Sequence, residues 1–336
     1  MSGIEDKTII DVLIMDKLNF SIFLSQHRTY IMGISMICVM LFHQRFLDGN
    51  FFDFFHHCGR WGVDVFLVVS GFGIAFSISK NNRKTYFVHR INRLLPTCVF
   101  FGLINTFFSL VIFHAAVQRR LYFMLPFSLE HWYIFAIAIY YLLAPYICKT
   151  IYKYKITILC VTVIISYIML YITRIEMSIT NIDVSIIWPL DWAIERFPAF
   201  CFGMILFTMH NWKIERYFFV FSAFLICLLS YLMMSEIKLF GSLIYCDQIF
   251  MLLIPAFCLF CGILEKATDI LRITNCVKWV GKYSLQMYLA HELCFALVKR
   301  YVPCSQNSQF LIAILISILY AYLVYLLVGK IKILRR

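Results

Sequence analysis

The sequence predicts an all-α polytopic membrane protein with about ten transmembrane helices. Of its 336 residues, 62% are hydrophobic and 14% are charged, whereas a soluble domain is about 45–50% apolar and about 25% charged. The apolar runs approach the roughly 20 residues that a spanning helix needs. They are continuous rather than alternating, which favours helices over a β-barrel.

In chain order the apolar runs lie at residues 29–47, 62–79, 91–114, 132–148, 156–173, 190–209, 217–234, 247–264, 279–299 and 309–329. We interpret each run as one helix that crosses the bilayer. The sixth run is the weakest, because Asp191, Glu195 and Arg196 crowd its start. If Arg196 pairs with one of those two acids, the charges there are purely structural.

The basic residues predict that both termini are cytoplasmic. With the N-terminus inside, most of the 30 Lys and Arg residues fall in inner segments, as the positive-inside rule requires. The net charge of +12 is therefore a topology signal and gives no indication of nucleic-acid binding. We expect a cytoplasmic segment at 1–28, a membrane domain at 29–329 and a basic cytoplasmic tail at 330–336, with membrane lipid as the surroundings.

Two ionisable residues near the outer side form a candidate reaction centre. His43 lies close to the outer end of the first run, and Asp64 lies near the outer start of the second. Ionisable groups inside apolar spans are costly and usually mark function. If the two residues lie at similar depth, the carboxylate would orient the imidazole and raise its basicity. The alternative is a histidine hydrogen-bonded to a neighbouring helix and an aspartate that caps the second helix.

Other polar residues in the outer half are candidates for the substrate site. Glu130 and His131 begin the fourth run, beside a Trp and a Tyr that could equally form an interfacial aromatic belt. Glu130 could also be a favourable charge at a helix N-terminus. His291 and Glu292 are adjacent inside the ninth run, which is harder to explain as packing.

On the inner side, Arg90 and Arg93 begin the third run. Arginines at positions i and i+3 share one face of a helix, and such a pair can clamp phosphate oxygens. The alternative is a topology signal at the inner boundary that attracts anionic lipid.

No metal site is expected from the cysteines and the remaining histidines. Cys258 and Cys261 lie inside a predicted span, where we interpret them as small packing residues. His56, His57 and Cys58 are three consecutive residues, which is poor geometry for one metal ion.

Several motifs occur together, in order, along most of the chain. They are Gly62–Phe72, Arg90-x-x-Arg93-x-x-Pro96, His131–Tyr133, Leu142–Pro145, Phe200–Gly203 and Gly281–His291. Together with His43, they resemble acyltransferase family 3. Its members are bacterial membrane enzymes that transfer an acyl group, often acetyl, to surface glycans and other exported or lipid-linked acceptors.

The resemblance implies roles for particular residues. His43 would be the essential histidine of the first span, and Arg90 and Arg93 would belong to the arginine pair associated with the donor. It further implies O-acetyltransferase-like activity in the bacterial cytoplasmic membrane, with acyl-coenzyme A as donor substrate and no permanently bound cofactor.

One position departs from the family pattern. The family usually has Arg or Lys eleven positions before the histidine, and here that residue is Met32. The nearest base, Arg28, lies about 22 Å before His43 along a helix. It cannot occupy the same place without a distortion of the helix, so another cation substitutes or the donor is handled differently.

The resulting hypothesis has two sides. Arg90 and Arg93 hold the phosphates of the donor at the inner face, while the pantetheine arm enters the helix bundle. His43, oriented by Asp64, acts on an acceptor hydroxyl as a general base or carries the acyl group briefly, and His131 or His291 lines the acceptor site. The alternatives are a transporter or flippase for a glycan precursor, although no inverted repeat is evident, and a membrane scaffold without catalysis.

Overall fold

The computed structural model describes residues 17–43, 59–111, 132–180, 184–209, 213–234, 243–328 and 331. Within these residues the chain forms eleven helices and one short antiparallel pair of strands. The elements are β1 (Lys17–Asn19), α2 (Phe20–Phe42), α4 (Trp61–Lys80), α5 (Arg83–Val111), α7 (Trp132–Lys153), α8 (Lys155–Thr180), α9 (Val184–Thr208), β2 (Lys213–Glu215), α10 (Arg216–Met234), α11 (Leu243–Ile270), α12 (Thr274–Lys282), α13 (Ser284–Tyr301) and α14 (Gln306–Val328).

The helical prediction is confirmed, since nearly all described residues of the predicted apolar runs lie in helices. Among the described residues, six helices are long and apolar enough to cross a membrane, namely α4, α7 and α14 and most of α5, α8 and α11. The count of ten spans, the orientation of the termini and the division at 28 and 329 stay predictions.

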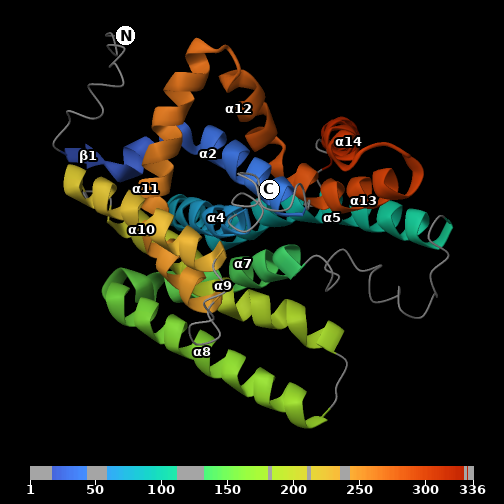
Figure 1. The fold of residues 1–336 in the computed structure, drawn as a ribbon. Helices are drawn as coiled ribbons and strands as arrows, with labels where there is room; N and C mark the ends of the chain where they lie inside the picture. The colour runs from blue at the N-terminus through green and yellow to red at the C-terminus, as the bar shows by residue number, and fades with distance from the viewer. Residues whose placement is uncertain are drawn as a thin grey trace.

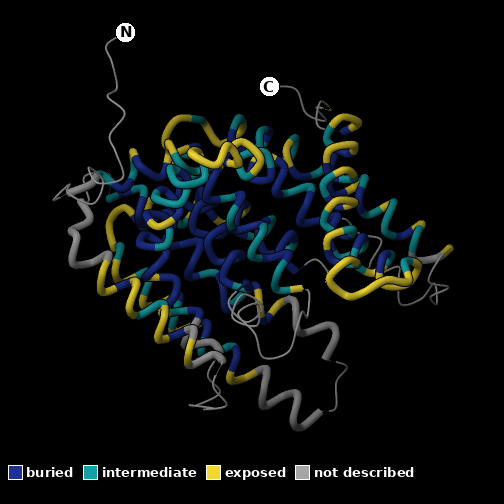
Figure 2. The backbone as a smooth tube through the Cα atoms, turned by 45° about the horizontal axis from the view of Figure 1, so that its top comes forward, coloured by how far each residue is buried: buried dark blue, intermediate teal, exposed yellow. Residues whose placement is uncertain are grey.

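Helix α4 lies in the middle of the bundle, with α2, α7, α9 and α11 around it (Figure 1). Every residue from Trp61 to Phe72 is buried. The tube coloured by burial shows the same arrangement, with buried segments in the centre and exposed ones at the edges (Figure 2). The motif Gly62–Phe72 therefore lies in the core of the helix bundle.

Two glycines let α4 and α9 approach closely. A Cβ atom on Gly71 would lie 2.1 Å from the carbonyl oxygen of Phe200, and one on Gly203 would lie 2.0 Å from that of Val68. Small residues allow such backbone contact between membrane helices. Two of the sequence motifs therefore meet each other across this interface.

Helices α8 and α14 carry exposed apolar side chains on the surface of the bundle. Ile164 and Ile168 of α8 and Leu319 and Leu327 of α14 are all at least half exposed. Apolar surface of this extent indicates contact with a membrane or another protein. It fits a helix bundle whose periphery faces lipid.

Helix α2 begins at Phe20 rather than at residue 29. The side chain of Asn19 accepts a hydrogen bond of 3.3 Å from the backbone N–H of Ile22 and so caps the helix. His43 is the C-cap residue, and its N–H bonds the carbonyl of Val39. Hydropathy placed the start too late because the first turns are amphipathic, although Phe20 and Leu24 are buried.

The ninth run is not one continuous helix, because α12 ends at Lys282 and α13 begins at Ser284. Helix α12 packs backbone to backbone on α2: a Cβ atom on Gly281 would lie 1.8 Å from the carbonyl oxygen of Thr29. The predicted start at 279 is therefore wrong. Packing on α2 gives α12 a different direction from α13, which a hydropathy pattern does not reveal.

Candidate active site

His43 lies at the end of α2 against α13. Its Nε2 atom is 3.9 Å from Oε1 of Glu292, and its ring is 4.8 Å from the ring of His291, edge to face. The His43 side chain is 33% exposed and that of Glu292 is 40% exposed, whereas His291 is fully buried. An accessible imidazole therefore has a buried imidazole and a carboxylate beside it.

The orientation of His291 is fixed by the backbone of its own helix. Its Nδ1 atom is 2.6 Å from the carbonyl oxygen of Tyr288. A carbonyl only accepts hydrogen bonds, so Nδ1 carries the hydrogen and donates it. In the neutral ring, Nε2 is then the atom with a free electron pair.

Asp64 lies with a different partner from the one predicted. Its carboxylate is hydrogen-bonded to the guanidinium of Arg196, and both side chains are buried. Gly62 packs against the carbonyl oxygen of Ser35, which is about 12 Å before His43 along the helix. This contact offsets the start of α4 from His43 along α2, and the structure pairs Asp64 with Arg196 of α9 and not with the predicted His43.

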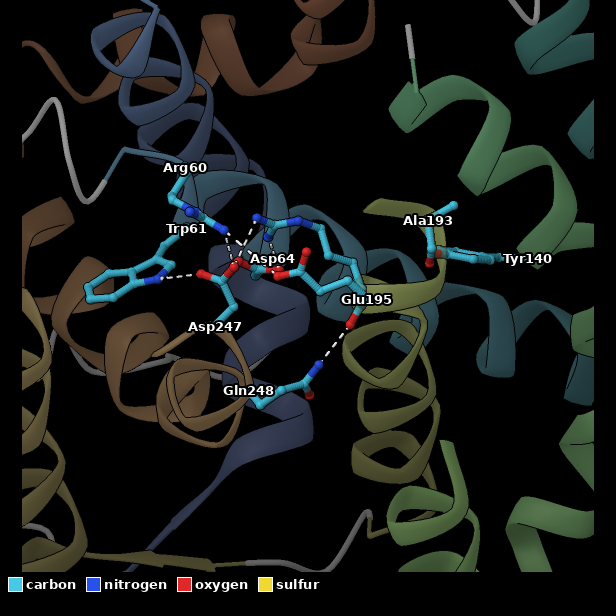
Figure 3. Close-up of polar contacts among 9 residues, drawn as sticks. Arg60, Trp61, Asp64, Tyr140, Ala193, Glu195, Asp247 and Gln248 are labelled. Carbon is cyan, nitrogen blue, oxygen red and sulfur yellow. Dashed lines mark hydrogen bonds and ion pairs between the residues drawn. The ribbon is translucent and has the colours of Figure 1, made fainter. Parts of the chain in front are cut away.

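Asp64 belongs to a buried charge cluster that joins α4, α9 and α11 (Figure 3). Arg196 donates a second hydrogen bond, 3.3 Å long, to Asp247, and the indole N–H of Trp61 donates one of 3.0 Å to the same carboxylate. Arg60 also donates to Asp247 and lies 3.8 Å from Glu195. The ion pairs of Arg196 are with acids on other helices, Asp64 and Asp247, while the predicted partner Glu195 adds an electrostatic attraction.

A group of three arginines lies at the other end of the candidate site. Arg90 and Arg93 come from α5, and the guanidinium of Arg28 on α2 interacts electrostatically with both. The rings of Tyr86 and Tyr141 lie 5.6 Å and 5.5 Å from the Arg90 guanidinium, as in cation–π contacts. We call Arg28, Arg90 and Arg93 the arginine group.

A narrow cavity lies beside the arginine group. Its volume is about 30 Å³, and it is lined by Met32, Phe66, Ser70, Arg93, Leu94, Tyr133, Ile137, Tyr141, Ser284, Leu285 and Tyr288. Arg93 is shared with the arginine group, while the ring of Tyr288 lies 5.5 Å from that of His291. A thioester on a flexible arm would have to push these side chains apart to pass.

His43, His291 and Glu292 are the residues that come nearest to a metal-binding arrangement in the part of the chain described. Their possible ligand atoms lie within 4.8 Å of one another. A tetrahedral ion with bonds of about 2.0–2.1 Å needs ligand atoms about 3.3 Å apart, so the three side chains would have to close around it.

Several predicted candidates lie outside the described residues, namely Glu130, His131, His56, His57 and Cys58. Cys258 and Cys261 are described and are buried in the core of α11. Their burial among apolar side chains agrees with the interpretation as packing residues.

A comparison with known protein families identifies the family of this chain. The family model described as an acyltransferase domain, acyltransferase 3, matches residues 30–327, nearly the whole chain. The chain belongs to the acyltransferase 3 family. Comparisons with curated proteins and with solved structures gave no match.

Membership of the acyltransferase 3 family confirms the resemblance drawn from the motifs and makes this chain a multi-pass membrane acyltransferase. The matched range holds His43, Arg90, Arg93 and His291, whereas Arg28 lies just before it. Sequence reasoning missed the place of Arg28 beside the arginine pair. The only available signal was its position one helical turn before Met32.

Proposed function

We propose that this membrane acyltransferase moves an acyl group, acetyl in the simplest case, from cytoplasmic acyl-coenzyme A to a hydroxyl of an exported or lipid-linked glycan. Its proposed location is the bacterial cytoplasmic membrane. One observation carries the proposal: the cavity has Arg93 in one wall and Tyr288, the neighbour of His291, in another. An arginine of the donor-binding pair and the neighbour of a buried histidine thus line the same cavity.

The arginine pair suits the charged end of the donor. Acyl-coenzyme A carries several phosphate charges that cannot enter hydrocarbon easily, whereas its pantetheine arm is thin. Arg93 is exposed and Arg90 is half-buried, so phosphates can reach both while the arm enters the cavity. Guanidinium groups bind phosphate oxygens in pairs of parallel hydrogen bonds.

His43 supplies the base in this proposal. Its Nε2 atom takes the proton of the acceptor hydroxyl as the oxygen attacks the thioester carbonyl. The carbon–sulfur bond then breaks, the ester forms, and the coenzyme A thiolate receives the proton from the imidazolium. Glu292 stabilises the imidazolium, a role that the sequence had suggested for Asp64, and His291 holds the ring from behind.

The test is transfer of label from radioactive acetyl-coenzyme A to an extract of surface polysaccharide by the purified protein. Replacing His43 with Ala should abolish the transfer while the protein still inserts and folds. His27→Gln is the matched control, since His27 lies on the same helix and bonds Glu265 at 2.7 Å, and it should keep most of the activity.

Label that reaches the polysaccharide at the normal rate in the His43→Ala protein would rule out this mechanism. Movement of an unlabelled saccharide across vesicles, without any transfer from the donor, would instead favour a transporter. Label that stays on the protein after rapid quenching would show that His43 carries the acyl group itself.

A further inference from the structure

Arg28 stands on the same face of α2 as Met32, one helical turn earlier. Its two terminal nitrogens lie 3.0 Å from the point where a Cβ atom on Gly73 would be. The absence of a side chain at Gly73 therefore leaves the space that the guanidinium occupies against α4. The side chain is half-buried, so it is held in the bundle and not spread on its surface.

The arginine group carries positive charge that no carboxylate offsets among the residues described. The described ion pairs place Asp64, Asp247 and Glu195 beside Arg60 and Arg196. The others place Glu265 beside His27 and Lys278, and Glu292 beside His43. Three like charges held together without a counter-charge repel one another, and an anion would relieve that repulsion.

A second observation points to the same kind of ligand. The Nε atom of Arg90 is buried without a hydrogen-bond partner in the described part of the chain. Two tyrosine rings flank this guanidinium and hold it in place, but they leave its charge largely uncompensated. A buried donor without an acceptor is costly, so an oxygen-rich ligand is expected there.

Given the proposed function, on which this inference rests, we propose that Arg28 is a third donor-binding residue and that the arginine group recognises the phosphates of the coenzyme A nucleotide. Three guanidinium groups suit a ligand with several phosphates better than a single carboxylate. The cation absent at Met32 is thus replaced one turn away, about 6 Å farther from His43.

A cation at residue 28 and not at residue 32 separates binding of the nucleotide from the chemical step. A cation in the cavity wall would affect both. Met32 lines the cavity and presents an apolar side chain to the passing arm. Arg28 is too far along the helix to act at the thioester beside His43. It should therefore govern binding of the nucleotide and have little effect on the chemical step.

The experiment measures coenzyme A affinity and donor choice with the purified full-length protein in lipid nanodiscs. Arg28→Met should weaken coenzyme A binding at least tenfold and raise the KM for acetyl-coenzyme A, with kcat changed less than threefold. Transfer from acetyl-pantetheine, which lacks the nucleotide, should be unchanged. Arg28→Lys keeps the charge and should restore most of the affinity.

Arg83→Met is the matched control, because Arg83 lies at the start of the same helix as the arginine pair, over the ring of Tyr146. It should bind coenzyme A like the wild type. Competition by adenosine 3′,5′-bisphosphate, and not by vesicles of anionic phospholipid, would identify the nucleotide as the ligand.

If Arg28→Met binds coenzyme A like the wild type while Arg90→Met and Arg93→Met lose it, the inference is overturned and the proposed function stands. Loss of acetyl-pantetheine transfer in Arg28→Met, with Arg28→Lys equally inactive, would also overturn it, because Arg28 would then act in chemistry or folding. If the wild type binds no coenzyme A, the proposed function fails together with the inference.

Discussion

At the scale of the residue, the environment of His43 differs from that of every other described histidine. It is exposed to solvent on one side and faces His291 and Glu292 on the other. The sequence correctly placed His43 near one end of a helix. It could not reveal the partner, because that depends on how far α4 and α13 are shifted along α2.

Glu292 should matter for the rate of acyl transfer. In Glu292→Gln the charge that would stabilise the imidazolium is removed, so kcat should fall about 10- to 100-fold, less than the loss of the base itself, which is typically about 10²–10⁴-fold. The measurement is the steady-state rate with saturating acetyl-coenzyme A. Glu292→Asp should retain part of the activity, and a Gln variant at full rate would exclude the carboxylate from catalysis.

Asp64 should affect stability first. Asp64→Asn leaves the buried guanidinium of Arg196 partly uncompensated, and breaking a buried pair costs about 3–5 kcal/mol. We expect a lower thermal unfolding temperature in detergent and less folded protein in the membrane. A variant that unfolds like the wild type yet transfers no acetyl group would instead restore Asp64 as a catalytic residue.

At the scale of the element, glycines set the distances between helices. Hydropathy identified the helices because each apolar run has to satisfy its backbone internally. It did not identify the early start of α2 or the break before α13. Those features depend on Asn19 as a cap and on the contact between Gly281 and Thr29.

Two glycines of the bundle should respond differently to the same change. Gly203→Ala forces a methyl group onto the backbone of Val68 and should cost about 3 kcal/mol or more, as severe overpacking does. Gly73→Ala meets only the flexible end of Arg28, so it should fold but bind coenzyme A more weakly. Thermal unfolding and binding measurements on both proteins separate the two effects, and equal losses of stability would contradict this.

At the scale of the whole molecule, the predicted topology places the arginine group on the cytoplasmic side and His43 on the outer side. The charge distribution in the sequence supports this orientation. Hydropathy and charge together predict how the chain crosses the bilayer, but the cavity is lined by residues from five separate helices, α2, α4, α5, α7 and α13. No local pattern in the sequence predicts that these helices come together around one cavity.

Two exposed cysteines of the chain can test the orientation without any mutation. Cys276 lies in the first turn of α12 and Cys304 lies between α13 and α14, and both are exposed. A membrane-impermeant maleimide should modify Cys304 in intact spheroplasts and reach Cys276 only after permeabilisation, with the sites assigned by peptide mass spectrometry. The reverse pattern would invert the topology and place His43 on the cytoplasmic side.

The break at Tyr283 has a further consequence for how the enzyme works. Helix α12 packs closely on α2, and a separate helix, α13, begins at Ser284. Helix α13 carries Ser284 and Tyr288 of the cavity wall and also the two neighbours of His43. The cavity wall and the neighbours of His43 are therefore not independent parts of the molecule. A shift of α13 along α2 would move Ser284 and Tyr288 together with His291 and Glu292.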